Sequence, residues 1–301
     1  KGWFMAQDTR TLRVTTPLFL YGAEQGKPEI RAASVRGQLR YWFRAIEGAN
    51  TTQLDGLWAA ESALFGSTAG GSAVSIRIYP EEGVITDRYA MLPHRSDQKS
   101  QSWQDAISPD QRLRLEIVTR PGIDKVPPRV VKSLVVWLLL GGLGKRSRRM
   151  FGALESPALT GKLTDGSALA DEIERYLQTI VKYSPKSEVP EFPTLHPDYS
   201  RVVVGTVGFP DWESLIKDLF GLLRSDNYRP HERTFGYAME RRRASPLIAQ
   251  VRRISGQYYP VLTAMRSTPD KDIEWDILDN FMDDAESRWQ GKTVWGGRLA
   301  R

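Results

Sequence analysis

The side chains best suited to chemistry in this chain are cationic, and the sharpest cluster lies between residues 141 and 152. This segment, GGLGKRSRRMFG, has three glycines in four positions and then four cations in five. Glycines let a backbone approach a phosphodiester closely, and cations supply the counter-charge. A nucleotide-binding P-loop is excluded because Gly144-Lys145 is followed by Arg146, where that motif has Ser or Thr. The pattern predicts a nucleic-acid-binding loop in preference to a solvated one, made by Gly141, Gly142, Gly144, Lys145, Arg146, Arg148 and Arg149.

A second cationic cluster lies near the N-terminus. Arg31, Arg36, Arg40 and Arg44 have no Asp or Glu between them, and the last three are four residues apart, so they share one face of a helix. A row of like charges is unfavourable unless an anion neutralises it. We therefore predict that Arg36, Arg40 and Arg44 bind phosphates, with Ser34 adding a hydroxyl as N-cap. The alternative is a solvated stripe whose aliphatic stems cover apolar surface.

A third cluster runs from residue 229 to 253, with seven arginines and two glutamates. Phe235 and Tyr237 are interleaved with the charges, as on a surface that binds phosphates and stacks bases. The pattern predicts RNA contacts by Arg241, Arg242 and Arg243. The alternative is that these three pair with an acidic segment that carries eight carboxylates between Asp270 and Glu286.

Residues for catalysis are scarce. The chain has no cysteine, which excludes a thiol nucleophile, a disulfide and a Cys-ligated metal, and fits a reducing compartment. His94, His196 and His231 each lie beside a proline in a predicted loop, with no partner at a recognisable spacing. Asp87 and Asp97 lack a second carboxylate at metal-ligand spacing. The sequence therefore favours binding over catalysis, and we expect neither a metal nor a cofactor.

The elements that position these residues divide the chain into two α+β halves. The length of 301 residues suggests two domains, which we place at 1–160 and 161–301. In the first half, alternating strands are expected at 9–14, 73–78 and 113–118, with helices from Ser34 to Ile46, 54–65 and 130–140. The polar segment 81–109 is expected to be an insertion. In the second half, helices are expected over 169–180, from Asp211 and over 273–289, with strands at 201–205, 247–254 and 258–265.

Composition sets broader limits. Lys plus Arg is 42 and Asp plus Glu is 36, so a net charge of +6 mildly favours a polyanionic partner. The hydrophobic fraction of 41% is that of an ordinary globular protein. No apolar run is long enough to span a membrane, and the first residues lack a secretory signal, so we expect a cytoplasmic protein.

Three segments together resemble the RAMP superfamily of CRISPR proteins. The first is TTPLFLYGAEQGKPEIRAASVRGQLRYWFRA, in which a Thr-Pro-Leu strand end and a loop precede Ser-hydrophobic-Arg-Gly-x-Leu-Arg. The second is the Gly-rich GGLGKRSRRMFGAL, and the third is FGYAMERRRASPLIAQV, in which Arg-Ala-Ser-Pro-Leu precedes a strand. Within the superfamily, the combination is most similar to the first-subunit family of the Cmr (type III-B) RNA-guided effector complex.

This resemblance implies two tandem ferredoxin-like (RRM-like) domains with insertions. It also implies a non-catalytic subunit that holds the guide (CRISPR) RNA and its paired target RNA near the guide 3′ end, beside other RAMP subunits of the Cmr complex. Backbone and shape recognition would make binding insensitive to sequence and sensitive to salt. Some RAMP proteins cleave RNA without a metal through a histidine, so a guide-processing or target-cleaving endoribonuclease is the alternative. A protein scaffold whose basic surfaces meet acidic neighbours is a third possibility.

Overall fold

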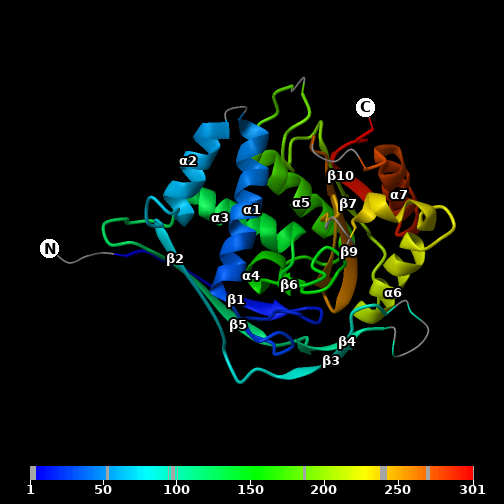
Figure 1. Ribbon diagram of the computed structural model, residues 1–301, viewed down its shortest axis with the longest axis horizontal. Helices are drawn as coiled ribbons and strands as arrows, with labels where there is room; N and C mark the ends of the chain where they lie inside the picture. The colour runs from blue at the N-terminus through cyan, green and yellow to red at the C-terminus, as the bar shows by residue number, and fades with distance from the viewer. Residues whose placement is uncertain are drawn as a thin grey trace.

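The computed structural model describes residues 5–51, 54–93, 95, 99, 101–185, 188–237, 243–268 and 272–300. The first half folds around an antiparallel sheet of order β2-β5-β1-β6 (Figure 1). Its elements are β1 (Gln7–Val14), α1 (Ala32–Asn50), α2 (Leu54–Phe65), β2 (Val74–Pro80), β3 (Thr86–Ala90), β4 (Trp103–Ile107), β5 (Arg112–Thr119), α3 (Pro128–Leu140) and β6 (Leu154–Glu155). Apart from α2 and the β3–β4 hairpin, this is the βαββαβ order of a ferredoxin-like domain.

The second half repeats the same arrangement. Its elements are α4 (Pro157–Thr160), α5 (Gly166–Ile180), β7 (Ser200–Val204), α6 (Trp212–Leu223), the 3₁₀ helix η1 (Arg229–Phe235), β8 (Leu247–Ile254), β9 (Gln257–Met265), α7 (Trp275–Arg288) and β10 (Lys292–Gly296). The sheet order β10-β7-β9-β8 matches that of the first sheet. The predicted fold class is confirmed, whereas the boundary at residue 160 stays a prediction.

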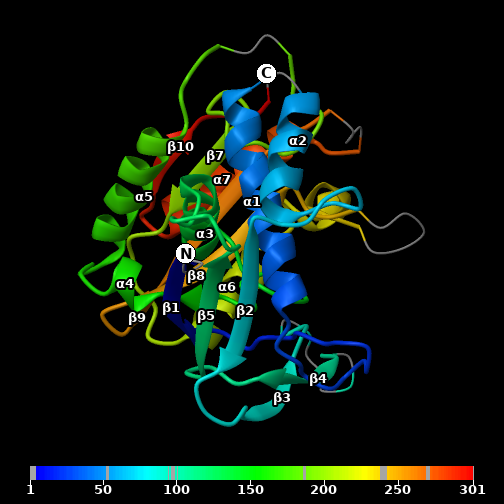
Figure 2. The ribbon, with the colours of Figure 1, turned by 90° about the vertical axis from the view of Figure 1, so that its left-hand side faces the viewer.

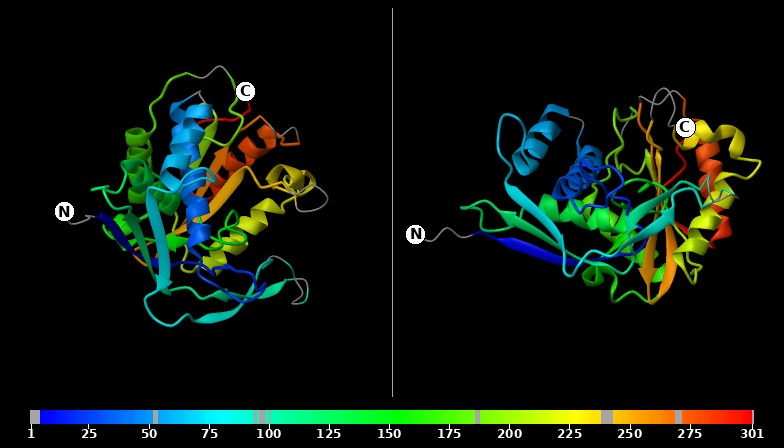
Figure 3. Two further views of the ribbon diagram at one scale, coloured as in Figure 1. Left: turned by 60° about the vertical axis from the view of Figure 1, so that its left-hand side comes forward. Right: turned by 60° about the horizontal axis from the view of Figure 1, so that its bottom comes forward.

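The second sheet is buried on both faces. Val261 of β9 belongs to a core shared with α1, α3 and the first sheet, whereas Leu262 and Ala264 belong to a core formed with α6 and α7. α3 packs against α1 and also contacts β8 and β9 (Figure 2). α6 and α7 lie on the far side of this sheet from α3 (Figure 3). α3 is therefore the layer that joins the two domains, and nearly every position of β8 and β9 is buried, polar residues included.

One local expectation needs correction, and one segment has more structure than its sequence indicates. α1 begins at Ala32, and Arg31 is its N-cap because the amides of Ser34 and Val35 donate to the Arg31 carbonyl at 3.2 and 3.4 Å. No side chain caps this end of the helix. Ser34 therefore lies inside the first turn and is not the N-cap. The insertion 81–109 contains the β3–β4 hairpin, whose first strand is largely exposed and so lacks the apolar alternation that marks a strand.

A fully buried arginine connects the domains. Arg252 of β8 donates from Nε to the Leu139 carbonyl at 2.9 Å and from Nη2 to the Gly141 carbonyl at 2.7 Å. These oxygens belong to the C-terminal end of α3, where the helix leaves carbonyls without intrahelical partners. Burial lowers the pKa of the Arg252 guanidinium to about 9. The interaction fixes the start of the Gly-rich segment against the second sheet.

Arg252→Ala should lower the free energy of unfolding by about 3 kcal/mol, since it leaves a cavity and two unpaired carbonyls at the domain junction. Denaturant unfolding of the full chain measures this. Arg253→Ala is the matched control: Arg253 is the next residue on β8 and pairs with the exposed Asp110 at 2.7 Å, so its loss should cost less than about 1 kcal/mol. Equal losses for the two variants would contradict the structural role of Arg252.

Candidate nucleic-acid interface

The Gly-rich segment from residue 141 to 152, here called the basic loop, is held as an added strand along β8. The Met150 amide donates to the Ala249 carbonyl at 2.9 Å, and the Ala249 amide donates to the Arg148 carbonyl at 3.3 Å. Arg149 and Ala249 form a parallel bridge. The loop also closes on the chain after β1, because the Lys145 amide donates to the Phe19 carbonyl at 2.8 Å. The basic loop is therefore built into the domain junction and covers a sheet edge.

The glycines of the basic loop make close contacts, but with the protein itself. A Cβ on Gly141 would lie 2.5 Å from Nε1 of Trp42, and one on Gly142 would lie 2.5 Å from Nε2 of Gln250. Gly144 has a φ of +83°, and a Cβ there would lie 2.5 Å from the Phe19 carbonyl oxygen. The close approach predicted for a phosphodiester is thus already taken by protein at these positions. The glycines position the loop, and its side chains carry the charge.

Two cations of the basic loop lie above tyrosine rings. The exposed Lys145 places Nζ 4.5 Å from the Tyr21 ring centroid and donates to Oε1 of Gln25 at 3.3 Å. Arg148 lies 5.4 Å from the Tyr41 ring centroid and donates to the Ser245 carbonyl. Within the described ranges, neither cation forms an ion pair with a carboxylate. Their charge remains available to an external anion.

The other two loop cations are more deeply placed. Arg146 has a φ of +62° and lies over the Phe220 ring, and burial together with the charge of Arg224 lowers its pKa to about 10. Arg149 donates to the Phe235 carbonyl, and burial with the charges of Arg146 and Arg148 lowers its pKa to about 9. Both border a cavity of about 160 Å³, here called the arginine pocket, whose lining also includes Arg224 and Arg229.

Sequence reasoning did not select Arg224 or Arg229 as site residues. Arg224 is the C-cap of α6, and a cation there is normally explained by the negative end of the helix dipole. Arg229 opens η1 inside the third cationic cluster, but its type alone does not distinguish it from its neighbours. Only the tertiary structure brings these two side chains beside Arg146 and Arg149.

The arginine row of α1 already has an internal anion. Nε of Arg40 lies 2.5 Å from Oε1 of Glu61, and Nη1 of Arg44 lies 2.9 Å from the same oxygen. Glu61 comes from α2, and its side chain is only 2% exposed. The row of like charges was expected to need an anion, and the Glu61 carboxylate supplies it. Arg40, Arg44 and Glu61 together carry one net positive charge. Arg36, one turn earlier, has no such carboxylate partner among the described residues, and its Nε is buried without a hydrogen bond.

The third cluster is described only in part. Arg241 and Arg242 lie outside the described residues. Arg243 forms an antiparallel bridge with Tyr237, and its guanidinium donates to the Arg233 carbonyl. The acidic helix α7 makes ion pairs within its own domain: Asp283 and Glu286 lie 2.6 and 2.7 Å from the buried Arg201 of β7.

The histidines differ in their surroundings. His196 is fully buried, with Nε2 2.7 Å from the Ser184 carbonyl oxygen. His231 is partly exposed, with Nδ1 2.8 Å from Glu274. His94 and Asp97 lie outside the described residues. In the part of the chain that the structure describes, no three His, Asp or Glu side chains are grouped to hold a metal, and each helix is too short or too polar to span a bilayer.

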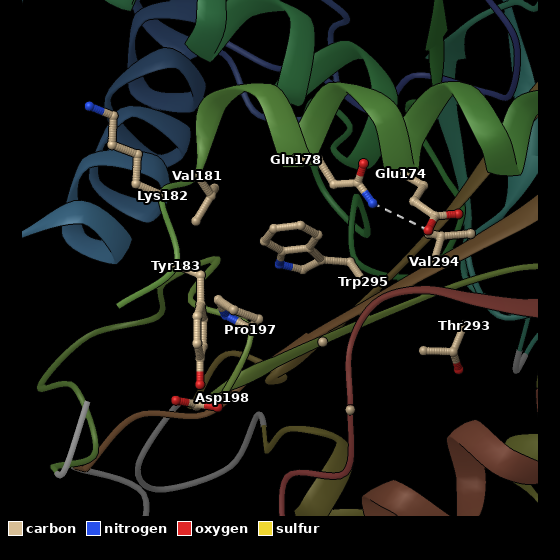
Figure 4. A pocket seen from close by; sticks show the side chains of 12 residues that line it. Glu174, Gln178, Val181, Lys182, Tyr183, Pro197, Asp198, Thr293, Val294 and Trp295 are labelled. Carbon is tan, nitrogen blue, oxygen red and sulfur yellow. Dashed lines mark hydrogen bonds between the residues drawn. The ribbon is translucent and has the colours of Figure 1, made fainter. Parts of the chain in front are cut away.

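Two further cavities differ in their relation to the basic loop. One of about 540 Å³ lies between the basic loop and the β3–β4 hairpin, with Arg88, Trp103 and Lys145 in its lining. Trp103 is 40% exposed, so the insertion brings an aromatic face beside the loop cations. A larger cavity, about 780 Å³, lies between α5 and β10 and has no basic-loop residue in its lining (Figure 4). Its charged lining is Glu174, Asp198 and Lys182, which does not suit a phosphate.

The chain is similar to one family model and to two curated proteins. The model of the RAMP superfamily matches residues 11–155. The CRISPR system Cmr subunit Cmr1-1 of Pyrococcus furiosus is 27% identical over 322 aligned positions, which cover 90% of this chain and 92% of that protein. Cmr1-2 of the same organism is 29% identical over 171 positions, which cover 48% of this chain and 91% of that protein.

Solved structures show the same fold. The crystal structure of Cmr1 from Pyrococcus furiosus in its apo form matches with a TM-score of 0.68 and 22% identity, covering 98% of this chain and 99% of that chain. A chain in the cryo-EM structure of the Type III-B Cmr-beta bound to cognate target RNA matches with a TM-score of 0.67 and 12% identity, covering 95% and 99%. The fold is therefore shared along nearly the whole chain.

Glu61→Gln should lower the free energy of unfolding by about 2 kcal/mol, because it removes a buried carboxylate that neutralises two partly exposed guanidiniums. Chemical denaturation of the full chain measures the change. Glu172→Gln is the control, since Glu172 pairs with the exposed Arg175 on α5 and should cost less than about 0.5 kcal/mol. A variant at Glu61 as stable as this control would show that Arg40 and Arg44 do not need the α2 carboxylate.

Proposed function

We infer that this chain is a member of the RAMP superfamily, whose model matches residues 11–155, and from that premise we propose that it is a non-catalytic RNA-binding subunit of a type III-B CRISPR effector complex. It holds guide RNA and the guide–target duplex near the guide 3′ end, beside other RAMP subunits, in antiviral defence. The likeness to Cmr1-1 over nine-tenths of the chain supports the assignment to a Cmr complex.

The observation that carries the RNA-binding role is the pair of loop cations without a carboxylate. Lys145 and Arg148 project from the basic loop over Tyr21 and Tyr41, on two different elements of the first domain. Cations without an acidic partner provide charge for phosphates, and the partly exposed Tyr41 adds a flat surface for a base, whereas Tyr21 is buried. Ser34, Arg36, Arg40 and Arg44 on α1, together with Arg241, Arg242 and Arg243, stay predicted RNA contacts.

Binding of this kind is governed by the phosphate backbone. Each phosphate neutralised by Lys or Arg releases condensed counterions, so affinity falls steeply as salt rises. The backbone of the basic loop is hydrogen-bonded to β8 and to Pro17 and Phe19, so the loop is in place before RNA arrives. A fixed row of cations reads backbone spacing and shape and not base identity, as a subunit that serves many different guides requires.

The double variant Lys145→Ala, Arg148→Ala should bind single-stranded RNA at least about tenfold more weakly at low salt, because two phosphate contacts are lost. The slope of log affinity against log salt should fall in magnitude by about 1.5. Fluorescence anisotropy with the full chain at several salt concentrations gives both values, and RNAs of unrelated sequence should respond alike.

Lys125→Ala, Lys162→Ala is the matched control, since both lysines are exposed and lie on the loops before α3 and α5, away from the basic loop. This control removes the same charge and should leave affinity and salt slope close to those of the wild type. If both double variants lose the same affinity, general charge and not the basic loop attracts the RNA, and the proposed interface is wrong.

A second function, metal-independent RNA cleavage, is favoured by one observation: His231 and Glu274 form an imidazole–carboxylate pair beside the third cluster. General acid–base catalysis uses such a pair when the imidazole can reach the reacting oxygen. We expect guide precursor and target RNA to remain intact when incubated with the chain in EDTA and in Mg²⁺, as followed by denaturing gel electrophoresis. RNA cleavage that is abolished by His231→Ala would replace the binding-only assignment.

A further inference from the structure

We propose that the arginine pocket binds a phosphate monoester, either the terminal phosphate of an RNA strand or that of a mononucleotide. The proposal rests on the proposed function and deepens it, because it separates an end-binding pocket from the open surface of Lys145 and Arg148. The pocket lies where the basic loop, the end of α6 and η1 meet, with Leu92 of the insertion at one side.

The walls of the pocket are both cationic and apolar. Arg146 and Arg149 come from the basic loop and form its deeper part, whereas Arg224 and Arg229 are exposed at its rim. Phe220, Leu223 and Phe235 complete the lining. Apolar walls exclude water and lower the local dielectric, which strengthens the attraction between the guanidiniums and an anion.

The charge of this pocket is not balanced within the described chain. None of its four arginines forms an ion pair there, and Glu232 is the single acidic residue of the lining. Nε of Arg146 is buried without a hydrogen-bond partner. Buried donors normally have acceptors, and clustered guanidiniums repel one another. The lowered pKa values of Arg146 and Arg149 report the same repulsion and burial. A bound anion would supply the missing acceptor and offset the repulsion.

The chemistry of the lining selects a phosphate monoester. Guanidinium groups match phosphate oxygens in paired hydrogen bonds and remain charged at neutral pH. A monoester carries nearly two negative charges at pH 7, which balances this excess of positive charge better than the single charge of a diester or a carboxylate. A cavity of about 160 Å³ has room for a phosphate group. The rest of the ligand would lie toward the rim, beside the exposed arginines.

The test compares one RNA sequence in three forms: with a 5′-phosphate, with a 3′-phosphate and with hydroxyls at both ends. We expect the full chain to bind one phosphorylated form at least about tenfold more tightly than the hydroxyl form. Adenosine monophosphate and inorganic phosphate serve as competitors. Preferential binding of phosphorylated RNA over both competitors identifies an RNA end as the ligand. Competition by adenosine monophosphate at least as effective as by phosphorylated RNA identifies a mononucleotide. Either result supports the proposed phosphate site if the preference is lost when the rim arginines are replaced.

The variant Arg224→Gln, Arg229→Gln removes the rim charge from exposed positions and should reduce the phosphate preference to less than about twofold. The control Lys125→Gln, Lys162→Gln should retain the preference. Equal affinity for all three RNAs, with no competition by the monophosphate, would overturn the proposal, as would a preference that survives in the rim variant. Failure of the proposed function is distinct, because the hydroxyl-ended RNA would then not bind to the wild type at all.

Discussion

The buried guanidinium of Arg252 holds the last turn of α3 against β8, and the placement of the basic loop follows from that contact. The carbonyls at the end of a helix carry partial negative charge, which a buried cation offsets without a carboxylate. From the same strand, Gln250 donates to the Ser147 carbonyl and Ala249 accepts from the Met150 amide. One strand of the second domain therefore supports the cationic loop of the first, together with the chain after β1.

The cationic side chains of this protein have different roles, and only some of them are available to bind an external anion. Some arginines are neutralised internally, as Arg40 and Arg44 are by Glu61. Others are buried donors to backbone carbonyls, as Arg252 is. Lys145 and Arg148 belong to neither group, since they lie over Tyr21 and Tyr41 and pair with no carboxylate of the described chain. The net charge of +6 averages these roles, and the proposed interface is centred on the last group.

The sequence was sufficient for the fold and insufficient for the partners of its charges. Alternation and turn residues correctly predict the strands β8 and β9. The sequence also predicts that a helix starts at Asp211, which is the N-cap of α6 and accepts from the Ser214 amide at 2.6 Å. Arg44 and Glu61 lie 17 positions apart on two different helices, and helical periodicity does not reveal their pairing. Gly142 illustrates the same limit. A glycine indicates that another group lies close to the backbone, but only the structure shows that this group is the Gln250 side chain.

Ultraviolet cross-linking of RNA to the chain in its assembled complex, followed by mass spectrometry of the peptides, tests the central claim most directly. The account predicts cross-links on the peptides that carry the basic loop and on those that carry Tyr21 or Tyr41, the rings beside Lys145 and Arg148. Cross-links confined to α5 and β10, with none between residues 15 and 45 or between 141 and 152, would contradict it.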